Sequence, residues 1–238
     1  MSAEAAAPAS RRPEALAPAT VQGLLLGVLA VAAFSLTLPA TRIAVADFSP
    51  LFVGFGRAVV AALAAGLFLL VGGQRWPTAR EARSLAVVAG GVVVGFPVLS
   101  SLAMREAEAA HGAVMLGVLP LATAVAGAVL TGERPSTAFW LAAVAGGAVV
   151  VVFGLVAGGG ALRWSDMALV GAALSAAIGY AEGARLARSL GSLNVISWAL
   201  VFAAPFLVLP AAWAAPADFS APWPAWLAFA DVSRLSQF

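Results

Sequence analysis

Three ionisable residues lie within long apolar stretches of this sequence, where burying a charged group costs free energy. Glu182 is the carboxylate placed deepest within such a stretch, close to Tyr180. A carboxyl group in that setting could carry a coupled proton or receive a cationic group of a ligand. Arg185 follows three residues later, so an ordinary salt bridge on one helical face is the alternative.

Arg57 and His111 are the other two candidates. Arg57 lies about two helical turns into the apolar stretch 50–73, where it could bind a carboxylate or hold Asp47 of the preceding loop. His111 begins the stretch 111–131 and could line the mouth of a cavity or cap its helix. Both residues therefore have a binding and a structural interpretation.

Other side chains could complete a small-molecule pocket. Such pockets combine apolar walls with a few hydrogen-bonding groups. The candidates are Thr37, Phe96, Ser100, Met115 and Tyr180. Together with His111 and Glu182 they form the predicted substrate-binding set, although each could equally pack in the protein interior.

Pro120 stands in the middle of the uncharged run "HGAVMLGVLPLATAVAGAVLTGERP". Proline removes a helical hydrogen bond and frees a carbonyl group, which membrane helices tolerate where protein or a water-filled cavity satisfies it. The run ends at Glu133 and Arg134, where charges can stay hydrated. We expect a kinked helix that either lines a cavity or simply packs there, with an ordinary polar end.

Composition argues against several classes of site. The chain has no Cys and a single His, which excludes thiolate nucleophiles and sites built from several Cys or His ligands. No basic run interleaved with aromatic residues suggests nucleic-acid binding. The sequence also lacks the clustered groups of membrane-embedded hydrolases and transferases. We therefore expect no enzyme, no cofactor, no metal and no nucleic-acid partner.

The elements that position these residues are membrane-spanning helices. The chain is 62% hydrophobic and only 10% charged, and several segments exceed the length needed to cross a bilayer. The predicted fold class is an all-α integral membrane protein, with lipid as its surroundings. The predicted spans are 21–41, 50–73, 84–104, 111–131, 137–157, 166–187 and 194–215, and an eighth begins near 223 but fails.

Arginine distribution gives the orientation. With a cytoplasmic N-terminus, eight Arg residues face the cytoplasm and three face the other side. The eight are Arg11, Arg12, Arg75, Arg80, Arg83, Arg134, Arg185 and Arg188, and the three are Arg42, Arg105 and Arg163. This distribution obeys the positive-inside rule and predicts a multi-pass protein of the cytoplasmic membrane. Residues 1–20 are predicted to be a disordered cytoplasmic tail.

Rows of small residues predict where helices approach closely. The stretch 50–73 carries Gly54, Ala58, Ala62 and Gly66, and the stretch 166–187 carries Gly171, Ser175, Gly179 and Gly183. Small residues one turn apart let two backbones come together in a membrane. We expect both rows to be packed faces.

The chain also aligns weakly with itself at an offset of 143 residues, pairing Leu26 with Leu169 and Arg42 with Arg185. Five spans separate the two units, so the second must enter the membrane from the opposite side. Inverted repeats of this kind are typical of secondary transporters, whose substrate site lies near the membrane midplane between the halves.

Two segments resemble a known family. The run "AFSLTLPATRIAVADFSPLFVGFGRAVVAALAA" is similar to the first two helices of EamA-type members of the drug/metabolite transporter superfamily, and "AEAAHGAVMLGVLPLATAVAGAVLTGERPSTAFWLAAVAGGAVVVVFGL" resembles their fourth and fifth helices. The resemblance implies a ten-helix fold of two inverted five-helix repeats that moves small solutes. It also implies structural or gating roles for Arg42, Arg57, Pro120, Glu133 and Arg134.

Relative to that family pattern, residues 21–157 form a first repeat and residues 158–238 an incomplete second one, with about seven complete helices and the start of an eighth. The leading hypothesis is a transporter or exporter of small organic solutes such as amino acids, metabolites or drugs, working by alternating access. The alternatives are a non-transporting fragment or assembly partner, as a homodimer or with a complementing chain, and a membrane-embedded enzyme.

Overall fold

The computed structural model describes residues 18–132, 135–218 and 220–234, and these contain helices but no strand. The elements are α1 (Pro18–Ser35), α2 (Thr37–Asp47), α3 (Pro50–Val71), α4 (Ala79–Val88), the π-helix η1 (Ala89–Gly95), α5 (Phe96–Met104), α6 (Ala109–Met115), the 3₁₀-helix η2 (Leu116–Val118), α7 (Leu119–Thr131), α8 (Thr137–Ala157), α9 (Trp164–Leu190), α10 (Ser192–Trp213) and α11 (Trp223–Arg234). The predicted all-α fold class is confirmed.

Seven segments of the described chain are long and apolar enough to cross a membrane. They are Gly27–Asp47, Pro50–Val71, Ala79–Met104, Ala109–Leu130, Thr137–Ala157, Trp164–Leu190 and Ser192–Trp213. Their number and positions agree with the predicted spans, so the chain is a multi-pass membrane protein. The eighth segment forms α11, whose 12 residues are too few to span the bilayer. Most of the predicted tail, residues 1–17, lies outside the described residues.

Three of the seven spans are interrupted, whereas the sequence predicts a break only in the fourth. The first span breaks between α1 and α2 at Leu36, the third passes through η1, and the fourth passes through η2. Pro39, Pro97 and Pro120 follow these interruptions by at most a few residues. A proline lacks the N–H that would bond the carbonyl four residues earlier, and its ring crowds that carbonyl, so each helix departs from α geometry.

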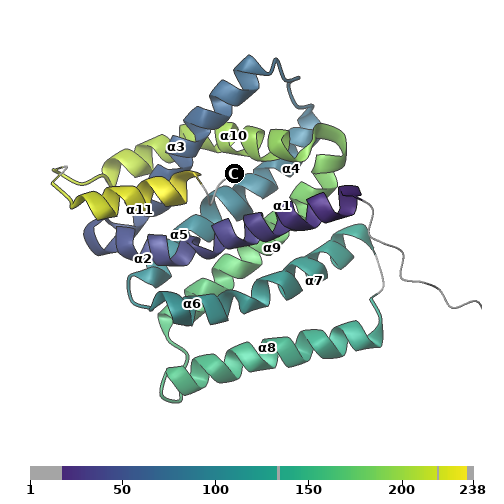
Figure 1. The fold of residues 1–238 in the computed structure, drawn as a ribbon, viewed down its shortest axis with the longest axis vertical. Helices are drawn as coiled ribbons and strands as arrows, with labels where there is room; N and C mark the ends of the chain where they lie inside the picture. The colour runs from purple at the N-terminus through teal and green to yellow at the C-terminus, as the bar shows by residue number, and fades with distance from the viewer. Residues whose placement is uncertain (1–17, 133–134, 219, 235–238) are drawn as a thin grey trace, which may run out of the picture.

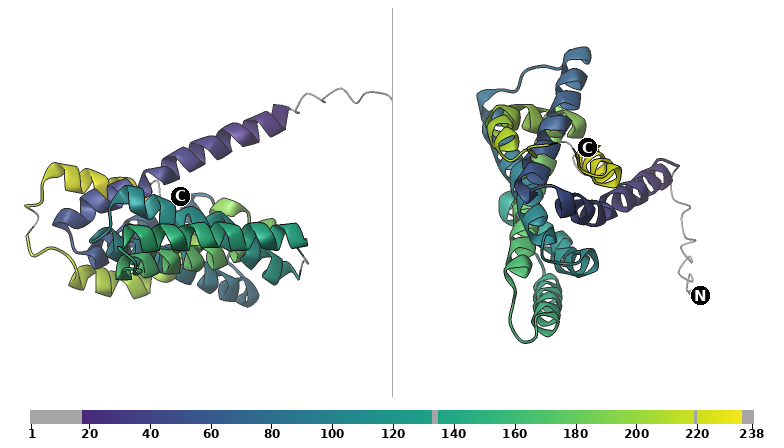
Figure 2. Two further views of the ribbon diagram at one scale, coloured as in Figure 1. Left: turned by 90° about the horizontal axis from the view of Figure 1, so that it is seen from below. Right: turned by 90° about the vertical axis from the view of Figure 1, so that its left-hand side faces the viewer.

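The bundle has a dense centre and two peripheral helices. α3 packs along α10, and α9 packs against α4, η1, α5 and α7. In Figures 1 and 2, α8 lies at one edge of the bundle and α1 extends away from it. Exposed apolar side chains on α8 (Val144, Val149 and Val152) and on α1 (Val28 and Val31) provide the lipid-facing surface of a membrane helix.

The predicted small-residue faces are confirmed in part: close contacts occur at Gly54, Ser175 and Gly179, whereas a Cβ added at Gly66, Gly171 or Gly183 would meet ordinary contacts of 3.4–3.8 Å. A Cβ atom added to Gly91 of η1 would collide with the Ser175 carbonyl oxygen, and one on Gly179 would lie 2.7 Å from a Val92 methyl group. The Ser175 hydroxyl also donates to the Gly91 carbonyl at 3.3 Å. On α3, a Cβ at Gly54 would lie 3.0 Å from the Val98 Cα. Only residues without bulk permit these approaches.

Two buried apolar clusters fill the interior. The first cluster is formed mainly by α2, α5, α9 and α11, and includes Phe48, Phe96 and Phe229. The second cluster is formed mainly by α3, α4, η1 and α10, and includes Ala58 and Trp198. Tyr180 of α9 packs against both clusters and therefore marks the boundary between them.

Candidate functional site

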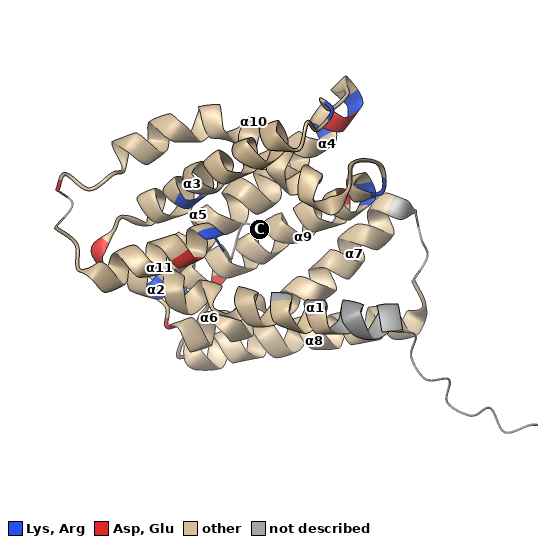
Figure 3. Ribbon diagram, turned by 45° about the horizontal axis from the view of Figure 1, so that its top comes forward, with Lys and Arg blue, Asp and Glu red and all other residues tan. Residues whose placement is uncertain are grey.

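Contacts between loops define the two ends of the bundle. At the Arg-rich end, formed by residues 72–78 and 188–194, the Gln74 side chain accepts a hydrogen bond from Asn194 at 2.9 Å. Arg75 donates to both carboxylate oxygens of Glu81, at 2.9 and 2.6 Å, and this contact raises the pKa of Arg75. At the other end, named here the pocket end, residues 48–49, 105–108 and 214 come together. Charged residues gather mostly near these two ends (Figure 3).

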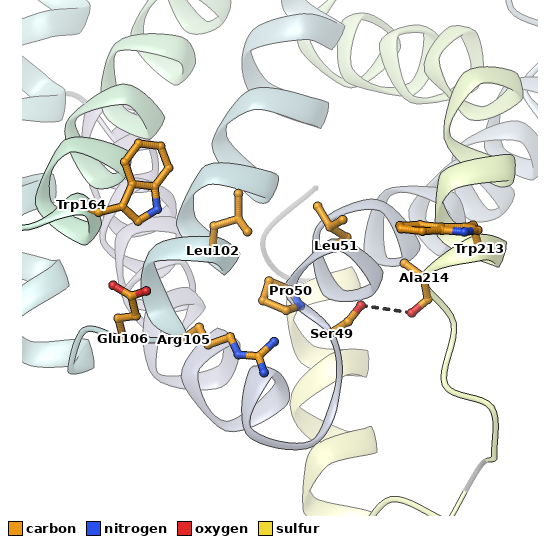
Figure 4. A pocket seen from close by; sticks show the side chains of 9 residues that line it. All are labelled: Ser49, Pro50, Leu51, Leu102, Arg105, Glu106, Trp164, Trp213 and Ala214. Atoms are coloured by element: carbon orange, nitrogen blue, oxygen red, sulfur yellow. Dashed lines mark hydrogen bonds between the residues drawn. The ribbon is translucent and has the colours of Figure 1, made fainter.

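A pocket of about 540 Å³ lies at the pocket end. It is lined by Ser49, Pro50, Leu51, Leu102, Arg105, Glu106, Trp164, Trp213 and Ala214. The lining side chains come from both sequence halves, and Trp164 and Trp213 stand on opposite sides (Figure 4). The Ser49 hydroxyl donates to the Ala214 carbonyl at 3.1 Å, which closes one wall. None of the predicted lining residues belongs to this pocket.

Arg57 has an unusual environment for a charged residue, because its side chain is buried among apolar groups. It lies on α3 with no solvent exposure, and Nε, Nη1 and Nη2 are all buried without a hydrogen-bond partner among the described residues. The alternative role of holding Asp47 is not realised, because Asp47 is exposed and no ion pair joins the two. The contact that Arg57 does make is with the Phe96 ring, whose centroid lies 6.0 Å from Cζ.

Besides Arg57, four further predicted residues lie in or beside the apolar clusters of the bundle interior. Phe96 is buried beside Arg57 and packs on Phe34 with ring centroids 5.7 Å apart. Thr37, three residues after Phe34, is buried and its hydroxyl has no partner among the described residues. Tyr180 is half-buried between the two clusters. Ser100 is fully buried, and its hydroxyl donates to the Pro97 carbonyl at 3.2 Å.

Glu182 forms the salt bridge that was the alternative to a binding role. Its carboxylate is buried and accepts hydrogen bonds from Nε (3.0 Å) and Nη2 of Arg185. Arg185 reaches on to the Ser84 hydroxyl at 3.2 Å, so the network joins α9 to α4. The substrate-binding role of Glu182 stays a prediction.

His111 is paired with a carboxylate that is absent from the predicted set. Its Nε2 lies 2.5 Å from Oδ1 of Asp166, and its ring packs on Phe153 with centroids 5.2 Å apart. The other oxygen of Asp166 accepts a hydrogen bond from the Arg163 backbone N–H at 2.9 Å. An acidic residue in the first turn of a helix is a recognisable N-terminal signal, and it could have identified Asp166 from the sequence.

The remaining predicted residues have structural surroundings. Arg42, expected in a loop, lies within α2 and donates to the carbonyls of Met104 and Arg105 at 2.6 and 2.8 Å, where α5 ends. Met115 is buried where α6 meets η2. Pro120 stands at the start of α7, directly after the expected break. Glu133 and Arg134 lie outside the described residues.

Comparisons with known proteins agree with this architecture. The EamA-like transporter family matches residues 21–155. The uncharacterized transporter YdeK of Bacillus subtilis (strain 168) is 44% identical over 218 residues, covering 91% of this chain and 76% of that protein. No solved structure matches the chain. The matched region contains five of the seven spans and the interruptions in three of them, and the chain belongs to the EamA-like transporter family.

Proposed function

We propose that this chain moves a small organic solute, such as an amino acid, a metabolite or a drug, across the cytoplasmic membrane by alternating access. Family membership supports transport of some solute. The observation that carries the finer proposal is the interruption of three spans within the membrane. Transporter sites are commonly built where membrane helices are discontinuous, since the freed backbone groups can bind ligand.

The interruptions lie near one another. Phe34 precedes the break between α1 and α2, and Phe96 begins α5 immediately after η1. Their rings are in contact, so the breaks in the first and third spans are neighbours. α2 also packs against α6, which leads directly into η2. A solute at this level would meet carbonyl groups whose helical hydrogen bond a proline has removed, contributed by several helices.

Packing between the halves supports the inverted repeat. The third span packs on α9, the first span of the second unit, through η1 and α5. α11 corresponds to the third span in the second unit, and it packs on α2 of the first span. In both contacts the third span of one unit packs on the first span of the other unit. This symmetry is expected where two inverted halves share one interior.

Uptake into vesicles tests the proposal. The purified chain is reconstituted into liposomes, and a panel of radiolabelled amino acids, other metabolites and drugs is offered with and without a proton gradient. We expect saturable accumulation of at least one solute above protein-free liposomes. A monodisperse, helical preparation that accumulates no member of the panel would contradict the proposal. Recovery of a chemically altered solute would favour the membrane-enzyme alternative instead.

A further inference from the structure

Arg57 combines complete burial with a complete lack of partners. The three guanidinium nitrogens are inaccessible to water and form no hydrogen bond with any described residue. A buried charge is ordinarily paired, because removing it from water without compensation is costly. A guanidinium also keeps its proton in proteins, so it cannot escape this cost by becoming neutral. This site therefore calls for an acceptor group that the described residues do not supply.

No carboxylate of the described residues pairs with Arg57. Glu182 accepts from Arg185, and Asp166 lies against His111. Asp47 is exposed at the end of α2. Asp231 of α11, a helix that packs on α3, is half-buried, and no ion pair joins it to Arg57. The chain itself therefore leaves the guanidinium without an anion among its described residues.

The surroundings of Arg57 suit a ligand that has an anionic head and an apolar body. Its neighbour Ala58 belongs to the second apolar cluster, and Phe96, against which the guanidinium lies, belongs to the first. Tyr180 packs on both clusters and can donate its phenolic proton. Arginine offers a planar pair of N–H groups that matches a carboxylate with two parallel hydrogen bonds.

The pocket lies at the start of the helix that carries Arg57. Ser49, Pro50 and Leu51 line the pocket at the start of α3. Arg57 lies seven residues beyond Pro50, which corresponds to about 10 Å along a helix. The backbone of Arg57 therefore lies roughly a third of the hydrocarbon thickness along α3 from the residues that line the pocket. Arg105, which also lines the pocket, adds a positive charge at its rim.

From these observations we infer that Arg57 is the anion-binding residue of the transport site, and that the solute carries a carboxylate. The carboxylate receives two hydrogen bonds from Arg57 and a third from Tyr180, while the body of the solute packs on Phe96. The inference rests on the proposed transport function and adds the charge of the solute to it. Transport of cationic or neutral solutes alone would refute the inference and leave the transport proposal intact.

Matched acid and amide pairs test the inference even while the natural solute is unidentified. The purified chain is heated in detergent with benzoate or benzamide, hexanoate or hexanamide, and N-acetylphenylalanine or its amide. We expect at least one acid to raise the midpoint of unfolding by about 3–5 °C at ten times its Kd, and its amide to have no effect. Equal effects of an acid and its amide, or no effect of any acid, would overturn the inference. Sodium sulfate and chloride at equal ionic strength serve as ion controls, and a shift by these salts as large as that by the acids would also overturn it.

Variants distinguish recognition from a structural role. Arg57→Met removes the charge and keeps much of the side-chain volume, and Arg57→Lys keeps the charge without the paired N–H groups. Without ligand we expect Arg57→Met to unfold at the same temperature as the unmodified chain or higher, and to lose the acid-dependent shift. Arg57→Lys should retain part of that shift. Arg188→Met, at an exposed position on α9, controls for loss of one positive charge and should keep the full shift. A large fall in the ligand-free midpoint of Arg57→Met alone would assign Arg57 to the fold and overturn the inference.

Discussion

Oδ1 of Asp166 on α9 lies 2.5 Å from Nε2 of His111 on α6, although the two residues are 55 positions apart in the chain. Asp166 is only 1% exposed, and its other oxygen accepts the Arg163 N–H. One carboxylate thus fixes both the start of α9 and the position of α6. This contact joins the two sequence halves near the pocket end, where Trp164 lines the pocket.

Replacing Asp166 with Ala should destabilise the chain by about 2–4 kcal/mol, because it leaves both the imidazole and the Arg163 N–H without their acceptor. Asp166→Asn should cost less, since an amide oxygen can still accept one of the two hydrogen bonds. Thermal unfolding in detergent, followed by circular dichroism, measures the difference. Asp218→Asn removes an exposed carboxylate and is the charge control. Equal stability of Asp166→Ala and Asp218→Asn would show that the contact contributes nothing.

The approach of η1 to α9 predicts opposite effects at two adjacent glycines. Gly91→Ala should destabilise the chain by about 1–3 kcal/mol, since its Cβ would collide with the Ser175 carbonyl oxygen. Gly90→Ala should be neutral or stabilising by up to about 1 kcal/mol, because nothing lies within 4 Å of its added Cβ and alanine favours helix. Chemical denaturation of both variants provides the comparison. Similar stability of the two would be inconsistent with the close packing of η1 on α9.

The Glu182–Arg185 pair predicts a measurable coupling. Each of Glu182→Gln and Arg185→Gln should destabilise the chain, and the double variant should cost less than the sum by about 0.5–1 kcal/mol. The coupling is small because half of the Arg185 side chain is exposed to screening. A double-mutant cycle of unfolding free energies gives this value directly. Strictly additive effects would mean that the two side chains do not stabilise α9 through their ion pair.

Labelling of single cysteines tests the proposed orientation. The natural chain has no Cys, so each engineered thiol is unique. Arg80→Cys and Arg188→Cys should react only from the cytoplasmic side, because both lie near the Arg-rich end. Glu108→Cys and Asp218→Cys, both exposed, should react from outside intact cells with a membrane-impermeant maleimide. Reaction of positions 80 and 188 from different sides would refute both the orientation and the span assignment.

The membrane spans could be predicted from sequence because length and apolarity alone decide whether a helix crosses a bilayer. The breaks within the spans were harder to predict from the sequence. Pro120 predicted its break, and Pro39 and Pro97 carried the same signal, yet Pro205 and Pro210 lie within an uninterrupted α10. A proline removes one hydrogen bond in every case, and the packing around it decides whether the helix changes geometry. That packing depends on residues distant in sequence, such as Gly91 and Ser175.

Partnerships within the site were predictable only where both partners lie on one helix. The pairing of Glu182 with Arg185 follows from their spacing of three residues. The pairing of His111 with Asp166 depends on how α6 meets α9, which periodicity does not encode. The lack of a hydrogen-bond partner for Arg57 could not be predicted from the sequence either, because it depends on every helix that packs around the guanidinium.

The proline breaks have a mechanical consequence for the half-helices at the pocket end. A continuous helix resists bending because its hydrogen bonds must lengthen, but at Pro39, Pro97 and Pro120 one bond per helix is already missing. α2 and α5 are tied together by the two hydrogen bonds from Arg42, so they tilt together rather than singly. The close packing of η1 on α9 at Gly91 and Gly179 does not have to change during such a tilt. We therefore expect these half-helices to bend at the three proline breaks more readily than within their continuous helical segments.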